Sequence, residues 1–219
     1  MHRALCALLL ATTAFAQQPP AAPAKPQRPT LLFREEWKQT LEVPLTQEFV
    51  SNPDLELKLY GPSAAEMRVT SEGASPPHTF SGMCPQTCAV ALHYKGGFAD
   101  LRGLAKMRWM TKTSGFHLVR PIIKLADGTW LVGDHAEGYE FDWHETEFYF
   151  SELRWQRLNI EKITPFGGWA TGVDLSKVDE IGFTDLMPGG GHGAARGTQS
   201  ATAWSDVARI EIYANAVAR

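Results

Sequence analysis

Apolar and polar residues alternate with a period of two along much of the chain after residue 30. Ile181 and Phe183 fall on one side of a segment near 178–185, and Ile210 and Ile212 fall on one side of a segment near 207–213. A strand with one buried and one solvated face shows this alternation. The last forty residues therefore predict two strands joined by a long loop.

Further segments are rich in β-forming residues and bounded by turn residues, whereas helical periodicity never persists beyond a turn or two. The predicted strands are 55–60, 89–94, 105–113, 118–126, 130–133, 146–150 and 154–160, with 31–37 as a strand or a short helical turn. Asp127-Gly128 suits a tight hairpin turn that pairs 118–126 with 129–134, because both residues tolerate positive φ. The pattern predicts an all-β fold, namely a two-sheet antiparallel β-sandwich (jelly roll) with few short helices.

The first sixteen residues have the features of a secretory signal peptide. Arg3 supplies positive charge, residues 4–14 are mostly apolar, and Ala14-Phe15-Ala16 fits a cleavage site. The apolar run is far shorter than the ~20 residues of a membrane-spanning helix. We expect an exported protein, periplasmic or extracellular, with a signal peptide at 1–16, a Pro/Ala-rich linker at 17–30 and a single β-sandwich domain at 31–219.

Charge narrows the range of partners. The formal net charge is −3, and loss of the signal peptide with Arg3 makes it more negative. The chain has no basic field of the kind that nucleic-acid binding needs. We expect a monomer with no nucleic-acid partner and no membrane span.

Cys84 and Cys88 are the only cysteines that remain after signal cleavage. An oxidising compartment lets disulfides persist, so we expect a local disulfide that shapes the loop between them. The alternatives are free thiols and a metal site, for which one Cys pair without a second Cys or His pair is weak evidence.

Three segments carry a family resemblance: Asp100-Leu101-Arg102-Gly103-Leu104, the stretch VDLSKVDEIGF at 173–183 and the stretch VARIEIY at 207–213. Together they resemble galactose-binding-like jelly rolls, and most closely carbohydrate-binding modules and intermediate-associated-protein type domains. The resemblance covers about residues 85–215 and implies a β-sandwich that binds carbohydrate. The usual final Asp-Asp-Ile is replaced by Ala208-Arg209-Ile210, which weakens the case for a calcium ligand there. No cofactor is expected, with a structural Ca²⁺ as the alternative.

Carbohydrate sites combine aromatic faces with polar side chains that bond hydroxyl groups. Alternation puts Met107 and Trp109 in the core and Arg108 on the opposite face, and Arg120 is expected on the face of Arg108. The predicted ligand-binding surface is one polar and aromatic sheet face, with a Gly-rich rim loop beside it, and comprises Arg108, Arg120, Lys124, Trp130, Arg157, Glu211 and, in the loop, His192. The alternative is a solvated face that carries ion pairs between strands.

Residues 134–147 concentrate six carboxylates and two histidines. Paired carboxylates are what glycoside hydrolysis needs, so Asp134, Asp142 and Glu145 are the candidate catalytic residues if the protein is an enzyme. The loop lacks the EF-hand spacing and the H-E-x-x-H pattern, and no serine lies in a G-x-S-x-G context. A solvated acidic connection is the alternative interpretation.

Three functions follow from the sequence. The first is an exported, non-catalytic carbohydrate-binding protein. The second is a glycoside hydrolase or polysaccharide lyase that uses the acidic loop at 134–147. The third is an envelope module that binds another protein.

Overall fold

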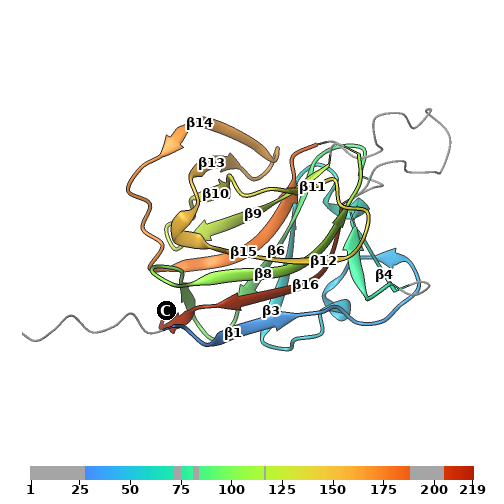
Figure 1. The fold of residues 1–219 in the computed structure, drawn as a ribbon, viewed down its shortest axis with the longest axis horizontal. Helices are drawn as coiled ribbons and strands as arrows, with labels where there is room; N and C mark the ends of the chain where they lie inside the picture. Colours follow the sequence, from blue (N-terminus) through green and yellow to red (C-terminus); the bar gives the residue numbers. More distant parts are fainter. Residues whose placement is uncertain (1–27, 72–74, 81–83, 116, 188–204) are drawn as a thin grey trace, which may run out of the picture.

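The structure is a computed structural model that describes residues 28–71, 75–80, 84–115, 117–187 and 205–219. Its strands form two sheets that pack face to face, and every strand pair is antiparallel (Figure 1). Helix is confined in this part of the chain to three short 3₁₀ turns, η1 (Gln47–Phe49), η2 (Ala64–Glu66) and η3 (Phe150–Glu152). The predicted all-β, two-sheet sandwich is confirmed.

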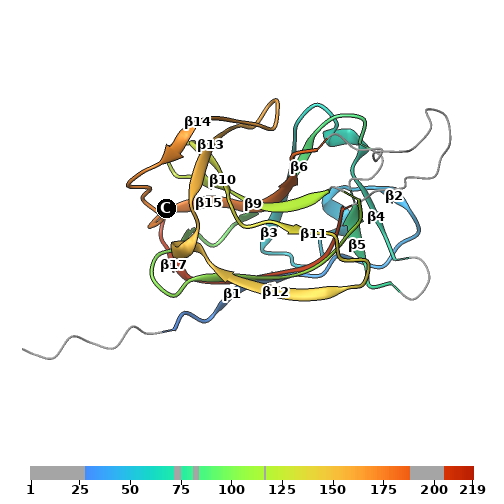
Figure 2. The same cartoon turned by 45° about the horizontal axis from the view of Figure 1, so that its top comes forward.

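The first sheet, called sheet A, has β16 near its centre. Its order is β12 (His144–Tyr149), β8 (Lys106–Thr113), β16 (Ser205–Tyr213), β5 (His78–Phe80), β4 (Arg68–Thr70) and β2 (Val43–Pro44), and β1 (Leu31–Glu35) also pairs with β16. The segment at 31–37, predicted as a strand or a helical turn, is thus a strand over its first five residues. In Figure 2, β1 and β12 lie in the lower layer.

The second sheet, called sheet B, ends at β14. Its order is β14 (Thr164–Ala170), β13 (Trp155–Asn159), β10 (Trp130–Gly133), β9 (Leu118–Leu125), β15 (Val178–Asp185), β6 (Cys88–Tyr94) and β3 (Leu55–Tyr60). Three short strands join it, β11 (Glu137–Gly138) on β9, β7 (Phe98–Asp100) on β15 and β17 (Asn215–Val217) on β7. Within the described residues, no helix is long and apolar enough to cross a membrane.

The predicted hairpin between β9 and β10 is present. Gly128 has φ +89° and its N–H donates to the Leu125 carbonyl oxygen at 2.9 Å. Trp130 then lies opposite Lys124 in the ladder. The Asp-Gly signal therefore identified the turn but not its register. The loop comprises residues 126–128, Asp127 is not at positive φ, and the Leu125 N–H donates to the Thr129 carbonyl oxygen.

The main core lies between the sheets and follows the predicted alternation. Met107 and Trp109 of β8 are fully buried, as are Ile210 and Ile212 of β16. Sheet B contributes the opposing side chains, among them Val90, Ile123, Ile181 and Phe183.

A second apolar cluster covers the outer face of sheet B. Its buried members are Ala89, Ala91, Ile122, Trp130, Val132, Leu158 and Ile163. Ile163 comes from the turn between β13 and β14 and is buried over this face. Its side chain lies so close to Gly61 that a Cβ added to Gly61 would be 2.6 Å from it. The carbonyl oxygen of Lys162, in the same turn, accepts a hydrogen bond from the Thr87 hydroxyl at 3.0 Å. The chain's own turn thus occupies part of this sheet face.

Candidate functional site

The predicted ligand-binding residues do not share one sheet surface, so that prediction is wrong. Arg108 and Glu211 lie on β8 and β16 of sheet A, whereas Arg120, Lys124, Trp130 and Arg157 lie on β9, β10 and β13 of sheet B. The separation arises because the short link between β8 and β9 crosses from one sheet to the other. In that link Gly115 has φ +65°, a backbone conformation that favours glycine.

On sheet A the charged side chains form ion pairs with one another. We call Arg34, Arg108, Glu145, Arg209 and Glu211 the ion-pair face. The fully buried Glu211 carboxylate contacts Arg34 Nη2 and Arg108 Nη2, each at 2.6 Å. Glu145 contacts Arg209 and lies 3.3 Å from Arg108. This is the alternative that the sequence offered, a face with ion pairs between strands.

Glu211 is held in its ionised form. Burial raises the pKa of this carboxyl, but the hydrogen bonds that it accepts from the Tyr213 hydroxyl at 2.8 Å and from Arg108 outweigh burial, and the net pKa is lowered. The groups that bond Glu211 are therefore engaged within the protein.

On sheet B, Lys124 and Trp130 are also engaged within the protein. Lys124 Nζ donates to the buried Glu180 at 2.7 Å, and the Tyr60 hydroxyl donates to the second oxygen of Glu180 at 2.8 Å. Trp130 is 8% exposed and meets the Tyr60 ring edge-to-face with centroids 4.9 Å apart. Arg120 is half-buried opposite Thr184 in the ladder. Trp130 is thus a packed side chain rather than an open aromatic platform.

Two of the candidate catalytic carboxylates belong to separate ion pairs on different sheets. Asp134 follows β10 of sheet B and binds Arg154 Nε at 2.7 Å, whereas Glu145 belongs to the ion-pair face on sheet A. Asp142 is exposed on the loop before β12. Burial raises the pKa of Asp134, but the bond from Arg154 outweighs it and the net pKa is lowered, which suits an ion-pair partner better than a general acid.

A cluster that the sequence did not single out gathers around Glu137 of β11. One carboxylate oxygen is 2.5 Å from His135 Nε2 and accepts from the Thr146 hydroxyl at 2.6 Å, and the other is 3.2 Å from His144 Nε2. Burial raises the pKa of Glu137, but the hydrogen bonds from His135, Thr146 and His144 outweigh it and lower the pKa to about 2. Glu137 therefore joins the segment after β10, through His135, to β12, through His144 and Thr146, by hydrogen bonds.

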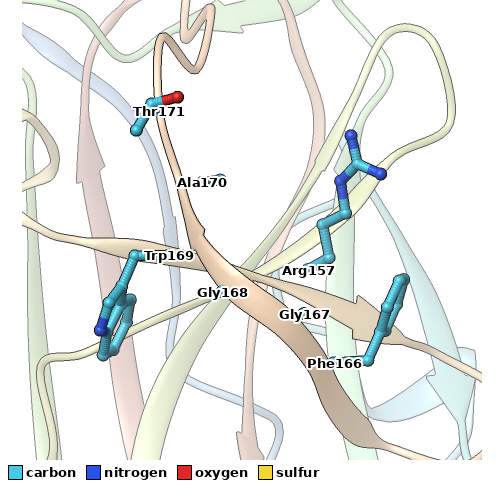
Figure 3. Close-up of a pocket in the computed structure, with 7 residues that line it drawn as sticks. All are labelled: Arg157, Phe166, Gly167, Gly168, Trp169, Ala170 and Thr171. Atoms are coloured by element: carbon cyan, nitrogen blue, oxygen red, sulfur yellow. The ribbon is translucent and has the colours of Figure 1, made fainter.

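One group of side chains that is open to a ligand lies on β14, the edge strand of sheet B. Phe166 and Trp169 are 50% and 47% exposed. Together with Arg157, Gly167 and Gly168 they form what we call the β14 platform, and these five residues line an open pocket of about 470 Å³ with Ala170 and Thr171 (Figure 3).

The local backbone explains the shape of the β14 platform. The ladder between β13 and β14 has an irregularity between Gln156 and Arg157, and Gly167 on the facing strand has φ +71°. A Cβ on Gly167 or Gly168 would meet no atom within 4 Å, so the strand is bare at this point. Figure 3 shows Arg157 and Phe166 pointing to the same side of the strand, with Trp169 on the other side.

The Trp169 ring is braced from outside the pocket. The Arg154 guanidinium lies over the ring, 4.5 Å from its centroid, and Asp134 holds that guanidinium. Such a cation–π contact fixes the orientation of an exposed ring. Asp134 therefore supports the β14 platform indirectly through Arg154.

A second exposed aromatic pair lies near the rim of the sandwich. Tyr139 and Phe141 are 71% and 54% exposed and meet edge-to-face with centroids 5.2 Å apart. Tyr139 and Leu118 help to line an apolar pocket of about 500 Å³ that has no charged side chain among its lining residues. The Tyr139 hydroxyl is the one polar side-chain group among these lining residues, so the pocket offers few groups to orient a hydrophilic ligand.

Several expectations concern other parts of the chain. His192 and the signal peptide lie outside the described residues. Cys84 and Cys88 are present as thiols with their sulfur atoms 2.9 Å apart, so the disulfide stays a prediction. Among the described residues, no group of three or more His, Cys, Asp or Glu side chains is arranged to hold a metal ion.

No protein-family model and no curated protein matches the chain. Among solved structures, it is similar to the family 11 carbohydrate-binding module of the cellulosomal cellulase Lic26A-Cel5E of Clostridium thermocellum, with 12% identity, a TM-score of 0.44 and coverage of 85% of this chain and 95% of the module. A family 11 module from Clostridium thermocellum in complex with a β-1,3-1,4-mixed-linked tetrasaccharide gives 14% identity, a TM-score of 0.44 and coverage of 83% and 100%. An exo-β-agarase gives 8% identity, a TM-score of 0.41 and coverage of 82% of this chain and 25% of the agarase.

Proposed function

We propose that the protein binds carbohydrate without transforming it, and that the β14 platform is the binding surface. One observation carries the proposal: Phe166 and Trp169, each about half exposed, flank two glycines and an arginine in an open pocket on an edge strand. The predicted export of the chain agrees with a glycan ligand outside the cell.

The chemistry of the β14 platform suits a sugar. A pyranose ring presents an apolar C–H face, which an exposed aromatic ring covers, and hydroxyl groups, which need hydrogen-bond partners. Arg157 is exposed and lies opposite Phe166 in the ladder, so its guanidinium donors lie next to the Phe166 ring. Gly167 and Gly168 leave the backbone open to close approach.

The described carboxylates support binding rather than cleavage. Glycoside hydrolysis needs two carboxyl groups across one cleft. The lining of the β14 platform pocket contains no carboxylate, and Asp134 is paired with Arg154, whose guanidinium lies over the Trp169 ring. The arrangement provides stacking and hydrogen bonding at this surface, which are the requirements of recognition.

The test is a glycan array followed by calorimetric titration with the best ligand. We expect Trp169→Ala and Phe166→Ala each to weaken binding at least tenfold, which corresponds to about 1.4 kcal/mol. Phe141→Ala is the matched control, because Phe141 is equally exposed but lies outside the β14 platform pocket.

Two results would contradict the proposal. One is that no saccharide binds the folded protein, or that both platform variants bind like the wild type. The other is release of shorter sugars from a polysaccharide panel, which would show that the protein is an enzyme.

A further inference from the structure

Three sulfur atoms meet in the core beside sheet B. The Cys88 sulfur is 2.9 Å from the Cys84 sulfur and 3.1 Å from the Met67 sulfur, and the Cys84 and Met67 sulfurs are 3.8 Å apart. Each of the three side chains is at most 3% exposed. A thioether thus completes a closed triangle with the two thiols.

Two short segments hold this triangle in place. Met67 directly follows η2, and the cysteines lie at the two ends of the loop 84–88. Ser63, just before η2, donates its N–H to the Thr87 carbonyl oxygen at 3.3 Å, and its hydroxyl accepts from the Gln86 N–H at 2.9 Å. The two segments are therefore tied together independently of the sulfur atoms, and the ligand set is assembled by the fold.

We propose that Met67, Cys84 and Cys88 form a binding site for a soft monovalent d¹⁰ metal ion, with Cu(I) as the ion that fits best. Thiolate and thioether sulfur are the donors that select Cu(I). Structural zinc takes four ligands, and no third Cys, His or acidic group joins the two cysteines among the described residues. Three sulfur donors in a buried setting suit an ion that accepts three-coordination.

The size of the triangle is compatible with a bound ion. Metal–sulfur bonds of about 2.3 Å place the corners of a planar trigonal site about 4.0 Å apart. The Cys84–Met67 edge of 3.8 Å is near this length already, and the two edges at Cys88 must widen by about 1 Å. Small rotations of the Cys88 side chain and of the unbranched Met67 side chain provide this change.

Binding replaces protons and involves no electron transfer. The ion displaces the proton of each thiol that coordinates it, and the Met67 thioether joins without a proton change. Oxidation of the pair to a disulfide removes both thiolates, so the site exists only in the dithiol form.

The test uses the full-length protein, refolded with a reductant and kept free of oxygen. Cu(I) is supplied as its complex with bicinchoninate, whose colour reports transfer of the ion to the protein. We expect one equivalent to transfer, a loss of affinity of at least a hundredfold in Cys84→Ser and Cys88→Ser, and a loss of about tenfold in Met67→Leu. Met110→Leu is the control, since Met110 lies on β8 away from the cluster.

A second measurement guards against variants that fail to fold. Under native conditions, iodoacetamide can reach the buried thiols only when the loop opens briefly, and in the wild type bound Cu(I) should protect both thiols from this alkylation. X-ray absorption of the Cu(I)-loaded protein should show three sulfur neighbours around the ion. The proposal is overturned if the folded dithiol protein retains no Cu(I), if alkylation is unaffected by the ion, or if folded Met67→Leu binds as tightly as the wild type. Because the β14 platform and this site share no residue, failure of one proposal leaves the other intact.

Discussion

The ion-pair face of sheet A and the β14 platform of sheet B both combine charged with aromatic side chains, yet they differ in what is left over for a ligand. On sheet A, Glu211 is fully buried beneath Arg34 and Arg108, and its charge is matched within the protein. On β14, Phe166 and Trp169 keep about half of their surface in water. A surface that satisfies its own groups has little to gain from a partner, whereas exposed rings gain when a ligand covers them.

The largest expected effect comes from breaking the ion-pair face. Glu211→Ala leaves Arg34 and Arg108 without their shared partner. We expect a loss of about 3 kcal/mol of unfolding free energy, the low end of the range for a buried pair, because these two arginine side chains are 44% and 32% exposed. Urea unfolding measures the loss. Glu147→Ala is the control, because Glu147 is 44% exposed in its pair with Lys106, whereas Glu211 is fully buried. A small loss for Glu211→Ala would mean that this face contributes little to stability, and glycan binding by the folded variant should not change.

Gly182, at the centre of sheet B, and Gly168, on the β14 platform, differ in the room that each leaves for a side chain. A Cβ on Gly182 would lie 1.9 Å from the Val90 carbonyl oxygen, whereas a Cβ on Gly168 would meet nothing within 4 Å. Gly182→Ala is therefore expected to destabilise the fold by about 3 kcal/mol, and Gly168→Ala by less than about 1 kcal/mol. Thermal unfolding of the two variants checks this. Equal losses would contradict the open geometry of the β14 platform.

Acid should weaken the contacts that depend on an ionised carboxylate, whereas the aromatic rings of the β14 platform do not titrate. The pKa of Glu137 is lowered from 4.5 to about 2 in the folded protein. Its contribution to stability is therefore fully present above pH 4.5 and is lost as the pH falls toward 2. We expect Glu137→Gln to remove about 2 kcal/mol at pH 7 and to flatten the acid side of the stability curve.

Urea unfolding at a series of pH values tests the Glu137 prediction. Glu140→Gln, an exposed neighbour, is the control. Curves of the same slope for the wild type and Glu137→Gln would show that the histidine contacts of Glu137 do not stabilise the folded state.

The smallest expected effect concerns the brace of the β14 platform. Arg154 is mostly exposed, so Arg154→Ala should change stability by about 0.5 kcal/mol at most. Loss of the Arg154 side chain frees the Trp169 ring to rotate, and we expect the dissociation constant for the glycan to rise about threefold. Titration calorimetry resolves this change. Unaltered binding would show that the ring needs no support from Arg154.

Much of the fold could be predicted from the sequence, because a period of two identifies strands and their buried faces. Met107, Trp109, Ile210 and Ile212 are all buried as the alternation indicated. The Asp-Gly turn after Ala126 was equally clear. Alternation says which face of a strand is buried, but not to which of two sheets the strand belongs. Arg108 and Arg120 were therefore assigned to one surface although they lie on different sheets.

Apart from Arg157, which the sequence analysis named as a ligand-binding residue, the β14 platform escaped prediction for a different reason. Pro165, Gly167 and Gly168 interrupt β14, and such residues are typical of turns rather than strands. An edge strand tolerates them because it needs hydrogen bonds on one side only. The exposure of Trp169 depends on its place at the sheet edge. His135 and His144 likewise meet at Glu137 because a loop folds back, and no periodic pattern of residues in the sequence predicts how a loop folds.

The position of β16 has a consequence for the order in which the molecule can form. β16 (Ser205–Tyr213) pairs with β8, β5 and β1, the last of which begins at Leu31. Until residues 205–213 leave the ribosome, β1, β5 and β8 have no common partner and sheet A has no centre. Pairings this distant in sequence are slow to close. Sheet A can therefore be completed only after residues 205–213 have been synthesised.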